Sequence, residues 1–414
     1  MTTWPLVKVA DACELVVDCV NRTAPLAAEP TPYKMIRTTN VRDGFIDTDN
    51  VRYVDETTFG RWTRRAVPLP GDVVLTREAP LGEVGIIRKA EPVFLGQRLI
   101  MYRAAPEKLD PYFLMYSMLG DFVQGQIRGY GSGATVEHMR LPDCLSLQLR
   151  LPPLGTQRKI AAILSAYDDL IESNNRRIKI LEEMAQRIYR EWFVDFRFPG
   201  HRDMPMAESE LGMVPRDWRV GRIDELCSVH KRPFEAKGDA ELPLLDMARM
   251  RQGSLAATAF GDPSELTTSR IVFEAGDLLF GAIRPNLRKV TLAPVRGVTN
   301  TSVLVIRPDS PRWHAFVVAL LSSEPVNRWA TQRATGTKMP VISWKELSAM
   351  ATLLPTEALA DAFSDIAAPL LEEVQVLSTL ITRLKATRDL LLPQLISGQV
   401  DVAGLEISVP EVAA

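Results

Sequence analysis

The stretch Leu151-Pro-Pro-Leu-Gly-Thr-Gln-Arg-Lys-Ile160 opens a run of apolar residues whose spacing alternates between four and three. Such a heptad pattern is typical of helices that supercoil around a partner helix. We therefore predict a helix from about Thr156 to Asp195, ~60 Å long at a rise of about 1.5 Å per residue. Its predicted seam consists of Ile160, Leu164, Tyr167, Ile171, Asn174, Ile178, Leu181, Ala185, Ile188 and Trp192.

A second run with the same alternation follows Leu354-Pro355 and predicts a slightly shorter helix from about Glu357 to Leu392. Two heptad seams in one chain can pair with each other. Pro369 lies inside the second helix and should kink or hinge it, because proline removes an intrahelical hydrogen bond. The predicted seam consists of Phe363, Ala367, Leu370, Val374, Leu377, Ile381, Leu384, Arg388, Leu391 and Leu395.

Asn174 and Arg388 are polar although they occupy seam positions. A polar seam residue costs stability and is an attested way to fix the register of paired helices. The alternative is a splayed, solvated stretch of seam. The sequence leaves both interpretations open.

The chain repeats itself outside the helices as well. Pro70-Gly-Asp-Val-Val-Leu-Thr76 parallels Ala275-Gly-Asp-Leu-Leu-Phe-Gly281, and Gly131-Ser-Gly-Ala-Thr135 aligns with Ala334-Thr-Gly-Thr-Lys338. Near the start of each unit, the segment from Trp4 parallels the one from Trp218. Self-similarity on this scale indicates a duplicated domain.

Each repeated unit mixes short β-rich runs with helices that begin near a proline. The predicted strands are 71–75, 84–87, 276–280, 289–292 and 302–306, and the predicted helices are 111–119 and 313–321. We therefore expect an α+β fold with an internal repeat. The predicted segments are mixed units at 1–152 and 215–355, long helices at 153–197 and 356–398, a linker at 198–214 and a frayed tail at 399–414.

Composition narrows the function. The net charge of −2 argues against an isolated nucleic-acid binder, which is usually basic, unless partner subunits share the phosphate contacts. The four cysteines form no CxxC pair, and the longest apolar runs are too short to span a bilayer. With no signal peptide pattern at the start, we expect a cytoplasmic protein with no membrane contact.

The sequence shows no recognisable catalytic or cofactor motif. There is no GxxxxGK[ST] loop, no HExxH and no GxSxG, and the four histidines are scattered. The carboxylate pairs Asp168-Asp169 and Glu182-Glu183 are expected to be solvated helix charges. We therefore predict a chain that is not an enzyme and binds no metal and no cofactor of its own.

Basic clusters near aromatic, glycine or hydroxyl residues are the candidate DNA contacts. Arginine suits bidentate reading of guanine, whereas lysine, hydroxyls and backbone amides suit phosphates. For each cluster the alternative is a solvated surface loop, but a basic loop containing Gly and Thr precedes the long helix in both units. The candidates in the first unit are Arg61, Arg64, Arg65, Arg128, Tyr130, Ser132 and Thr135. Those expected to play the matching parts in the second unit are Arg284, Asn286, Arg288, Lys289, Arg333, Thr335, Thr337 and Lys338.

Several separate motifs follow one another in the order typical of one family. They are Leu151–Ile171, Leu181–Ala185, Trp192–Phe196, Leu211–Trp218, Ala334–Pro340, Ser343–Leu347 and Arg388–Gly398. Together they resemble the specificity subunit of type I restriction–modification systems, over nearly the whole chain. The second unit departs from the pattern at Leu354–Ala358, which lacks the proline and glutamine found at Pro153 and Gln157.

The resemblance implies that the two mixed units are target-recognition domains, each reading one half of an asymmetric bipartite site on double-stranded DNA. It implies that the long helices pair antiparallel and set the length of the unread spacer. Two modification subunits would dock on the chain and bring S-adenosylmethionine for adenine methylation, and nuclease/translocase subunits can join them. Two rival interpretations stay open: a coiled-coil scaffold whose end domains bind proteins, and an enzyme in its own right.

Overall fold

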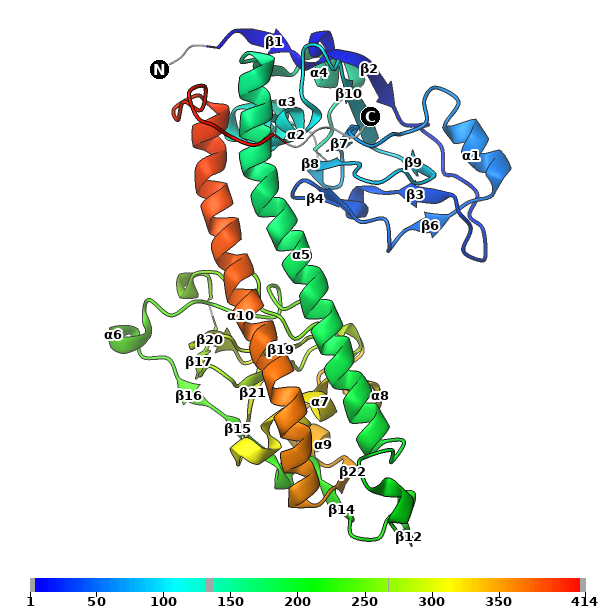
Figure 1. Cartoon of the computed structure of the whole chain (residues 1–414), viewed down its shortest axis with the longest axis vertical. Helices are drawn as coiled ribbons and strands as arrows, with labels where there is room; N and C mark the ends of the chain where they lie inside the picture. The colour runs from blue at the N-terminus through cyan, green and yellow to red at the C-terminus, as the bar shows by residue number, and fades with distance from the viewer. Residues whose placement is uncertain (1–3, 132–136, 267, 410–414) are drawn as a thin grey trace. The chain divides into compact units, whose positions relative to one another are not determined.

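The computed structural model describes residues 4–131, 137–266 and 268–409 (Figure 1). The chain divides into two compact units. Unit 1 contains Met1–Asp169 together with Ala386–Ala414, and unit 2 contains Leu170–Lys385. Each unit therefore takes a part of both long helices, α5 (Leu154–Phe193) and α10 (Glu357–Ile396). The segment boundaries predicted from the sequence stay a prediction.

Unit 1 is built on a four-stranded antiparallel sheet in the order β2-β10-β7-β8. These strands are β2 (Cys13–Asp18), β10 (Leu99–Ala104), β7 (Val73–Arg77) and β8 (Leu81–Ile86). The smaller sheets are β6 (Arg52–Tyr53) with β3 (Lys34–Ile36) and β9 (Val93–Leu95), β4 (Val41–Arg42) with β5 (Phe45–Ile46), and β1 (Leu6–Lys8) with β11 (Gln148–Arg150). The helices are α1 (Glu56–Trp62), α2 (Pro111–Leu119), α3 (Asp121–Gly131) and α4 (Leu141–Ser146).

Unit 2 repeats this topology, because its main antiparallel sheet has the order β15-β21-β18-β19. These strands are β15 (Cys227–His230), β21 (Val303–Pro308), β18 (Leu278–Gly281) and β19 (Val290–Leu292). The smaller sheets are β16 (Arg232–Pro233) with β17 (Arg270–Phe273) and β20 (Gly297–Asn300), β14 (Arg219–Arg222) with β22 (Ala351–Leu354), and β12 (Met206–Ser209) with β13 (Gly212–Pro215). The helices are α6 (Ala236–Asp239), α7 (His314–Ser322), α8 (Glu324–Arg333) and α9 (Trp344–Ser348).

The repeated Gly-Asp motif explains why both main sheets start in the same way. Gly71 and Gly276 have φ of 94° and 87°, values that a residue without Cβ adopts at little cost. The aspartate that follows each glycine is buried and accepts two hydrogen bonds from one arginine of the neighbouring strand: Asp72 from Arg103, and Asp277 from Arg307. A bidentate guanidinium–carboxylate pair fixes orientation as well as charge, so it holds the strand in register.

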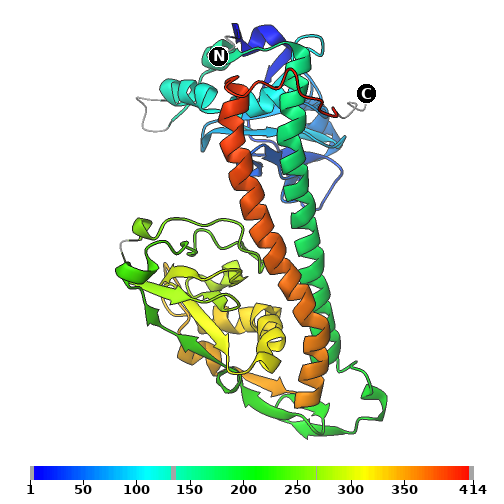
Figure 2. The same ribbon diagram turned by 60° about the vertical axis from the view of Figure 1, so that its left-hand side comes forward.

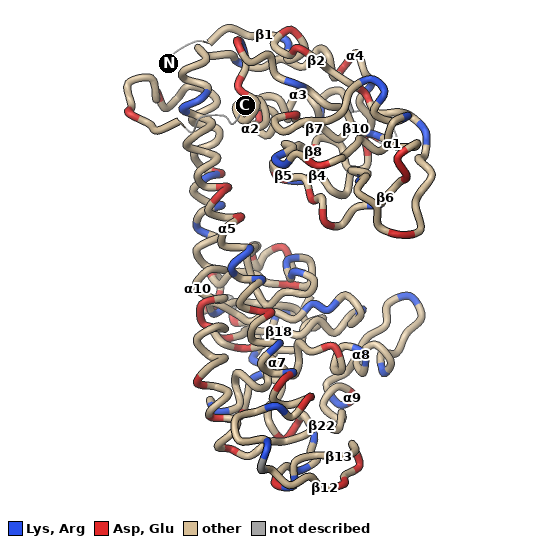
Figure 3. Tube along the Cα trace, turned by 45° about the vertical axis from the view of Figure 1, so that its right-hand side comes forward, with Lys and Arg blue, Asp and Glu red and all other residues tan. Residues whose placement is uncertain are grey.

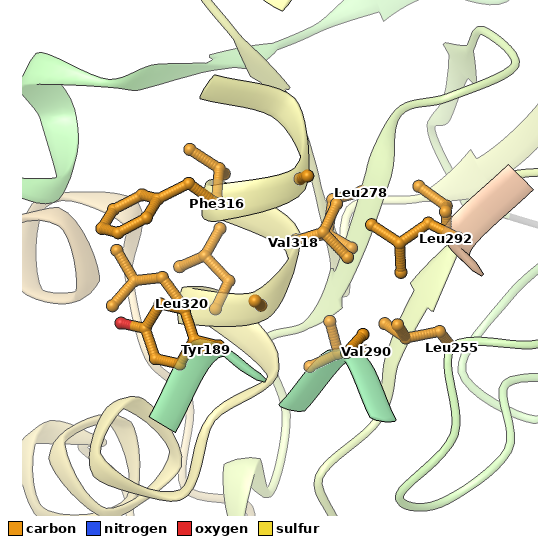
Figure 4. Packing of buried hydrophobic residues seen from close by; sticks show 14 of the residues in the cluster. Tyr189, Leu255, Leu278, Val290, Leu292, Phe316, Val318 and Leu320 are labelled. Carbon is orange, nitrogen blue, oxygen red and sulfur yellow. The ribbon is translucent and has the colours of Figure 1, made fainter. Parts of the chain in front are cut away.

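In both units α5 and α10 lie side by side (Figures 1 and 2). In unit 2, Tyr189 and Trp192 near the end of α5 contact Phe363 near the start of α10, whereas Arg177 ion-pairs with Glu373. Residue numbers on the two helices therefore run in opposite directions, and the helices pair antiparallel. Figure 4 shows Tyr189 of α5 among the side chains of α7, so α5 packs against the domain core as well as against α10.

The long helices differ in detail from their prediction. Both are 40 residues long, so the expectation of a shorter second helix was wrong. The second helix continues through Pro369 without ending there. The predicted seam residues that are buried are Ile160, Leu164, Ile171, Asn174, Ile178, Ala185, Trp192, Phe363, Ala367, Val374, Leu377, Ile381 and Leu395. Those that are half-buried are Tyr167, Leu181, Ile188, Leu370, Leu384, Arg388 and Leu391.

At three turns the buried position is the residue next to the predicted one. Asp168 is buried beside half-buried Tyr167, Tyr189 beside Ile188, and Leu371 beside Leu370. Each helix packs against a domain as well as against the other helix, so its buried face is wider than a two-residue heptad seam. The packing thus follows the 3.6-residue period of a globular helix more closely than a strict heptad.

The segments predicted as linker and tail are more ordered than expected. Most of the linker forms a turn of 3₁₀ helix (His201–Asp203) and the β12–β13 hairpin. In the tail, Val402 is buried, Ile407 packs against the core of unit 1, and the Lys159 ammonium donates to the carbonyl of Ala403. These contacts lie too far apart in the sequence to be read from local composition.

Candidate nucleic-acid interface

The turn between β7 and β8 and the turn between β18 and β19 begin in the same way. The amide of Met139 donates to the carbonyl of Arg77 at 3.0 Å, and the amide of Ile342 donates to the carbonyl of Ala282 at 3.0 Å. One residue further on, Glu78 forms a β-bridge with His138 before α4, and Ile283 forms one with Val341 before α9. The residue after that, Ala79 or Arg284, has φ of 49° or 50° and precedes a proline.

In unit 2 this turn continues into a 3₁₀ helix, η6 (Pro285–Leu287), and carries several exposed polar side chains. The amide of Arg284 donates to the carbonyl of Pro340 at 2.7 Å, and its guanidinium Nη2 lies 3.5 Å from the carbonyl of Lys338. Arg288 also has a left-handed backbone, with φ of 51°. The turn is therefore joined to the segment between α8 and α9.

The segment between α8 and α9 brings the second group of candidates to the same place. Arg333 ends α8 and stacks its guanidinium 4.5 Å from the centroid of the Trp329 ring. Thr335 pairs with Val341 through two backbone hydrogen bonds of 3.0 and 2.9 Å, which closes a loop around exposed Thr337 and Lys338. The structure thus brings together two groups that lie about fifty residues apart in the sequence.

We call Arg284, Arg288, Arg333 and Lys338 the basic turn cluster. Among the described residues, none of the four forms an ion pair with a carboxylate. Figure 3 shows blue segments at and beside α8. Unneutralised basic groups on joined loops are the electrostatic pattern expected of a phosphate or base contact.

The other two candidates of this turn differ from the cluster. Asn286 lies on η6 and is exposed. Lys289 is half-buried and its ammonium donates to the carbonyl of Met247 at 2.6 Å, so it ties the turn to a neighbouring loop.

The candidates of unit 1 lie on separate elements. Arg61 is in the last turn of α1, and Arg64 and Arg65 follow it, all three exposed. The guanidinium of Arg65 donates to the carbonyl of Asp18 at 3.3 Å. Arg128 is exposed on α3, and the Tyr130 hydroxyl on the same helix lies 3.0 Å from the Ser146 hydroxyl. Ser132 and Thr135 lie outside the described residues.

The structure corrects one of the matched pairs of clusters. The residues 61–65 follow α1 and precede β7, whereas 284–289 lie between β18 and β19. The counterpart of 284–289 in unit 1 is the turn at Ala79–Glu83. Residues 132–136 after α3 lie outside the described residues, so their match with the loop after α8 stays a prediction. Short basic stretches look alike in sequence, but only the strand order assigns them to a position.

Sequence reasoning missed Ala79, because an alanine carries no chemical signal. The carbonyl of Ala79 accepts a hydrogen bond of 2.9 Å from the Thr38 hydroxyl, so a second loop supports this turn. Neighbouring Glu78 ion-pairs with Arg98 at 3.2 Å and lies 3.3 Å from His138. Extending the alignment of Pro70–Thr76 with Ala275–Gly281 by three residues was the available signal.

Two acidic residues predicted to be solvated are instead packed against their units. Asp168 is 1% exposed and accepts hydrogen bonds of 2.6 Å from both Arg388 and the Tyr116 hydroxyl. The Glu182 carboxylate accepts from the Ser254 hydroxyl at 2.8 Å and from the amide of Leu255 at 2.7 Å. Burial raises the pKa of Glu182, and these hydrogen bonds offset part of the rise. Arg388, a polar seam residue, is therefore ion-paired between the helices.

The outward faces of the two long helices expose apolar side chains in a repeated pattern. On α5 these are Leu170, Ile180 and Met184, and on α10 they are Ile366, Val376 and Leu380. On each helix the second residue follows the first by ten positions and the third follows by four more. These spacings place each set on one side of its helix. We call the two sets the apolar stripes.

Other chemistry is limited in the described part of the chain. No group of three or more His, Cys, Asp or Glu side chains there could hold a metal ion. The four cysteines are free thiols, and burial raises the pKa of Cys144 to about 11, so this thiol is unreactive. None of the described helices combines the length and the apolar character needed to cross a membrane.

Comparisons with known proteins agree with the fold. Residues 1–183 match the family model of the type I restriction modification DNA specificity domain. The MjaIX specificity subunit of Methanocaldococcus jannaschii, a type I restriction enzyme, is 23% identical over 348 residues, which are 81% of this chain and 79% of that protein. The EcoDI specificity subunit of Escherichia coli is 22% identical over 267 residues, 58% of this chain and 59% of its own length.

A solved structure shows the same fold. The crystal structure of the type I restriction–modification S subunit from M. genitalium superposes with a TM-score of 0.57 at 16% sequence identity, covering 95% of this chain and 96% of that chain. The duplicated topology and the paired long helices are thus shared with a type I S subunit of known structure. Residues 1–183 match the type I restriction modification DNA specificity domain, and the chain as a whole is similar to type I restriction enzyme specificity subunits.

Proposed function

We propose that this chain is the DNA-recognition subunit of a type I restriction–modification complex. In this proposal unit 1 and unit 2 each read one half of an asymmetric bipartite site on duplex DNA. The continuous helices α5 and α10 connect the two readers and set the length of the unread gap. A DNA turn is ~34 Å, so a reader at each of two successive major grooves would contact the same side of the duplex.

The basic turn cluster is the single observation that supports DNA contact most directly. Arg284, Arg288, Arg333 and Lys338 come from two loops joined by backbone hydrogen bonds, and none of them ion-pairs with a described carboxylate, although Arg288 contributes to lowering the pKa of Glu324. Arginine and lysine on such loops suit base edges and phosphates. The overall charge of −2 is a reason to expect weak DNA binding by the chain alone, with partner subunits adding phosphate contacts.

The apolar stripes support the docking of partner subunits. Ile180 is 55% exposed and Val376 is 59% exposed, and exposed apolar residues grouped on one face mark protein contact sites. Arg177 and Glu373, which ion-pair with each other, lie between the first and second residues of the two stripes. Because both helices carry the stripe with the same spacing, we propose that two copies of one partner bind, one to each. In this proposal the partners are adenine-methyltransferase subunits, and nuclease/translocase subunits join the same complex.

The proposal assigns the chemistry to those partners. S-adenosylmethionine would bind to the methyltransferase subunits, which flip the target adenine out of the duplex before methylating it. The chain itself would be non-catalytic and would hold and select the DNA. A cytoplasmic location belongs to the proposal, because four free thiols are typical of a reducing compartment.

Selection from a randomised duplex pool tests the proposal. The chain is purified alone and as a complex with co-expressed modification subunits, and the bound duplexes are sequenced. We expect a split consensus from the complex and little enrichment by the chain alone. Selection of one continuous site would contradict the two-reader proposal.

The rival function, a scaffold that binds proteins and no DNA, makes the opposite prediction for the arginines. Changing Arg61, Arg65, Arg284 and Arg288 to Ala should lower the DNA affinity of the complex if these residues contact DNA. Unchanged affinity would favour the scaffold. Methyl transfer by the purified single chain would instead favour the second rival, an enzyme in its own right.

A further inference from the structure

The turns at Ala79 and Arg284 share a left-handed residue before a proline and carry different side chains, while the peptide bond to the proline is cis at Ala79–Pro80 and the chain enters η6 after Arg284. Both residues are exposed, both precede a proline, and their φ values differ by one degree. Residues other than glycine rarely adopt a left-handed backbone, and they keep it only where the surroundings impose it. The surroundings here are the same hydrogen bond from the segment before α4 or α9 and the same β-bridge one residue earlier.

Two DNA-reading domains that arose by duplication and recognise different bases need the same backbone position with different side chains. A shared frame presents a side chain to the duplex at the same place in each unit, and the identity of that side chain decides which base is accepted. We infer, as an extension of the proposed function, that positions 79 and 284 are matched base-reading positions. Arg284 reads a guanine in the major groove of one half-site, and Ala79 offers an apolar methyl group to one base pair of the other.

The contacts of Arg284 fit a reading role. Its Nη2 lies 3.5 Å from the carbonyl of Lys338, and among the residues that the structure describes no other group accepts a hydrogen bond from this guanidinium. Two of its N–H donors match the O6 and N7 acceptors of guanine. The neighbouring Arg333 and Lys338 are on the flanking loop, where they suit phosphates.

The internal repeat also indicates a substitution of Arg284 that should preserve the fold of the turn. Alanine occupies the same left-handed position in unit 1, so Arg284→Ala should leave the turn folded. Arg284→Lys keeps the charge but lacks the planar fork that makes two parallel hydrogen bonds. Arg328→Ala is the matched control, because Arg328 is exposed on the helix packed against η6 and ion-pairs with Glu324.

The experiment uses complexes of the full chain with its modification subunits and sequences the duplexes that each complex selects. We expect Arg284→Ala and Arg284→Lys to lose discrimination at one base pair of one half-site by about 5- to 150-fold. The gap and the other half-site should stay unchanged. We expect Ala79→Arg to change the preference at one base pair of the other half-site, and Arg328→Ala to select the wild-type consensus.

The outcomes separate this inference from the proposed function. A wild-type complex that selects no split consensus contradicts the proposed function itself. A wild-type split consensus that survives Arg284→Ala, with affinity lowered equally for all sequences, shows a phosphate contact and overturns the inference alone. A consensus changed in both half-sites by Arg284→Ala would also overturn it. Circular dichroism of each variant verifies that the chain remains folded.

Discussion

Asp168 and Arg388 form a buried ion pair between α5 and α10 in unit 1. The carboxylate is 1% exposed and also accepts a hydrogen bond from Tyr116. Removing Arg388 leaves the buried carboxylate with the Tyr116 hydrogen bond but without its counter-charge, which costs about 3–5 kcal/mol. We therefore predict that Arg388→Leu lowers the free energy of unfolding by about 3–5 kcal/mol, measured by urea denaturation.

Two further variants separate charge from packing at this site. In the double variant Asp168→Leu/Arg388→Leu most of the loss should return, because apolar residues can replace a buried ion pair at little cost. Tyr116→Phe removes one hydrogen bond and should cost only about 1 kcal/mol. A double variant as unstable as Arg388→Leu would contradict the explanation by an unpaired charge.

Glu182 gives the stability of unit 2 a pH dependence of known sign. Burial raises its pKa in the folded chain, so the native state binds a proton more tightly than the unfolded state. Its contribution to stability is greatest below the unfolded pKa of about 4.3 and is lost as the pH rises through the higher folded pKa. We predict that Glu182→Gln raises the melting temperature at pH 8 and changes it less at low pH.

The measurement is thermal unfolding of both proteins across this pH range. Glutamine retains an oxygen that can accept hydrogen bonds from Ser254 and Leu255, so the two proteins differ only in whether residue 182 can ionise. Destabilisation of Glu182→Gln that grows as the pH rises would show that the charged carboxylate is the favoured form and would contradict the prediction.

At these two residues the sequence prediction failed for a physical reason. A helical pattern indicates which face is apolar, but Asp168 borders that face, and its burial depends on an arginine 220 residues away. The exposure of Glu182 depends on a loop around Ser254 that packs on α5. By contrast, the roles of Asp72 and Asp277 had a visible signal, since the Gly-Asp motif occurs twice.

At the scale of elements, the apolar stripes of α5 and α10 should bind the partner subunits. We predict that Ile180→Asp together with Val376→Asp abolishes co-purification of modification subunits, because a buried charge in an apolar contact is costly. Pull-down with a tagged chain measures this loss. Lys179→Asp is the control: Lys179 adjoins the stripe and is exposed, so this variant should retain its partners.

One stripe alone gives a sharper test of stoichiometry. If each stripe binds one copy, Ile180→Asp alone should halve the partner content, measured by mass in solution. Loss of both copies in that variant would indicate that the partners bind each other and not two separate stripes.

The length of the paired helices should set the gap between half-sites. We predict that one heptad added to each helix, after Asp169 and after Lys385, widens the preferred gap by ~10 Å, about three base pairs. Seven residues nearly preserve the helical phase, so the pairing should survive. Adding four residues to each helix is the control, since it shifts the seam. An unchanged gap after the heptad insertion would contradict the spacer role.

The sequence predicted most of the elements that carry strong local patterns. The heptad runs located both long helices within a few residues, and the proline at Pro111 marked the start of α2. It did not predict the β12–β13 hairpin or the half-buried seam positions, because those depend on contacts with other elements. In the candidate site, the basic groups of unit 2 were visible, but their joining through Ile283 and Val341 was not.

At the scale of the whole molecule, unit 1 combines both ends of the described chain. Leu395 and Val402 are buried in the same core as Phe113 and Ile160. We predict that a chain ending at Ile396 loses about 1.5–3 kcal/mol of local stability in unit 1, because Val402 no longer covers that core. Hydrogen exchange should show faster exchange in β1 and β11 and no change in β18 and β21.

A point variant checks that this effect comes from the core. Val402→Ala should reproduce part of the loss in unit 1, since it removes two buried methyl groups. Equal acceleration of exchange in both units would mean that the tail stabilises the molecule globally, contrary to the prediction.

The composition of unit 1 from two distant segments also bears on biosynthesis. On the ribosome, unit 2 has all its residues once Lys385 has emerged, whereas unit 1 must wait for the segment from Ala386 onward although its larger part was made first. A polypeptide that terminates before Ala386 would therefore contain unit 1 without the end of α10 and the tail that complete it. Such a fragment should be cleaved by proteases within unit 1 more readily than the full chain.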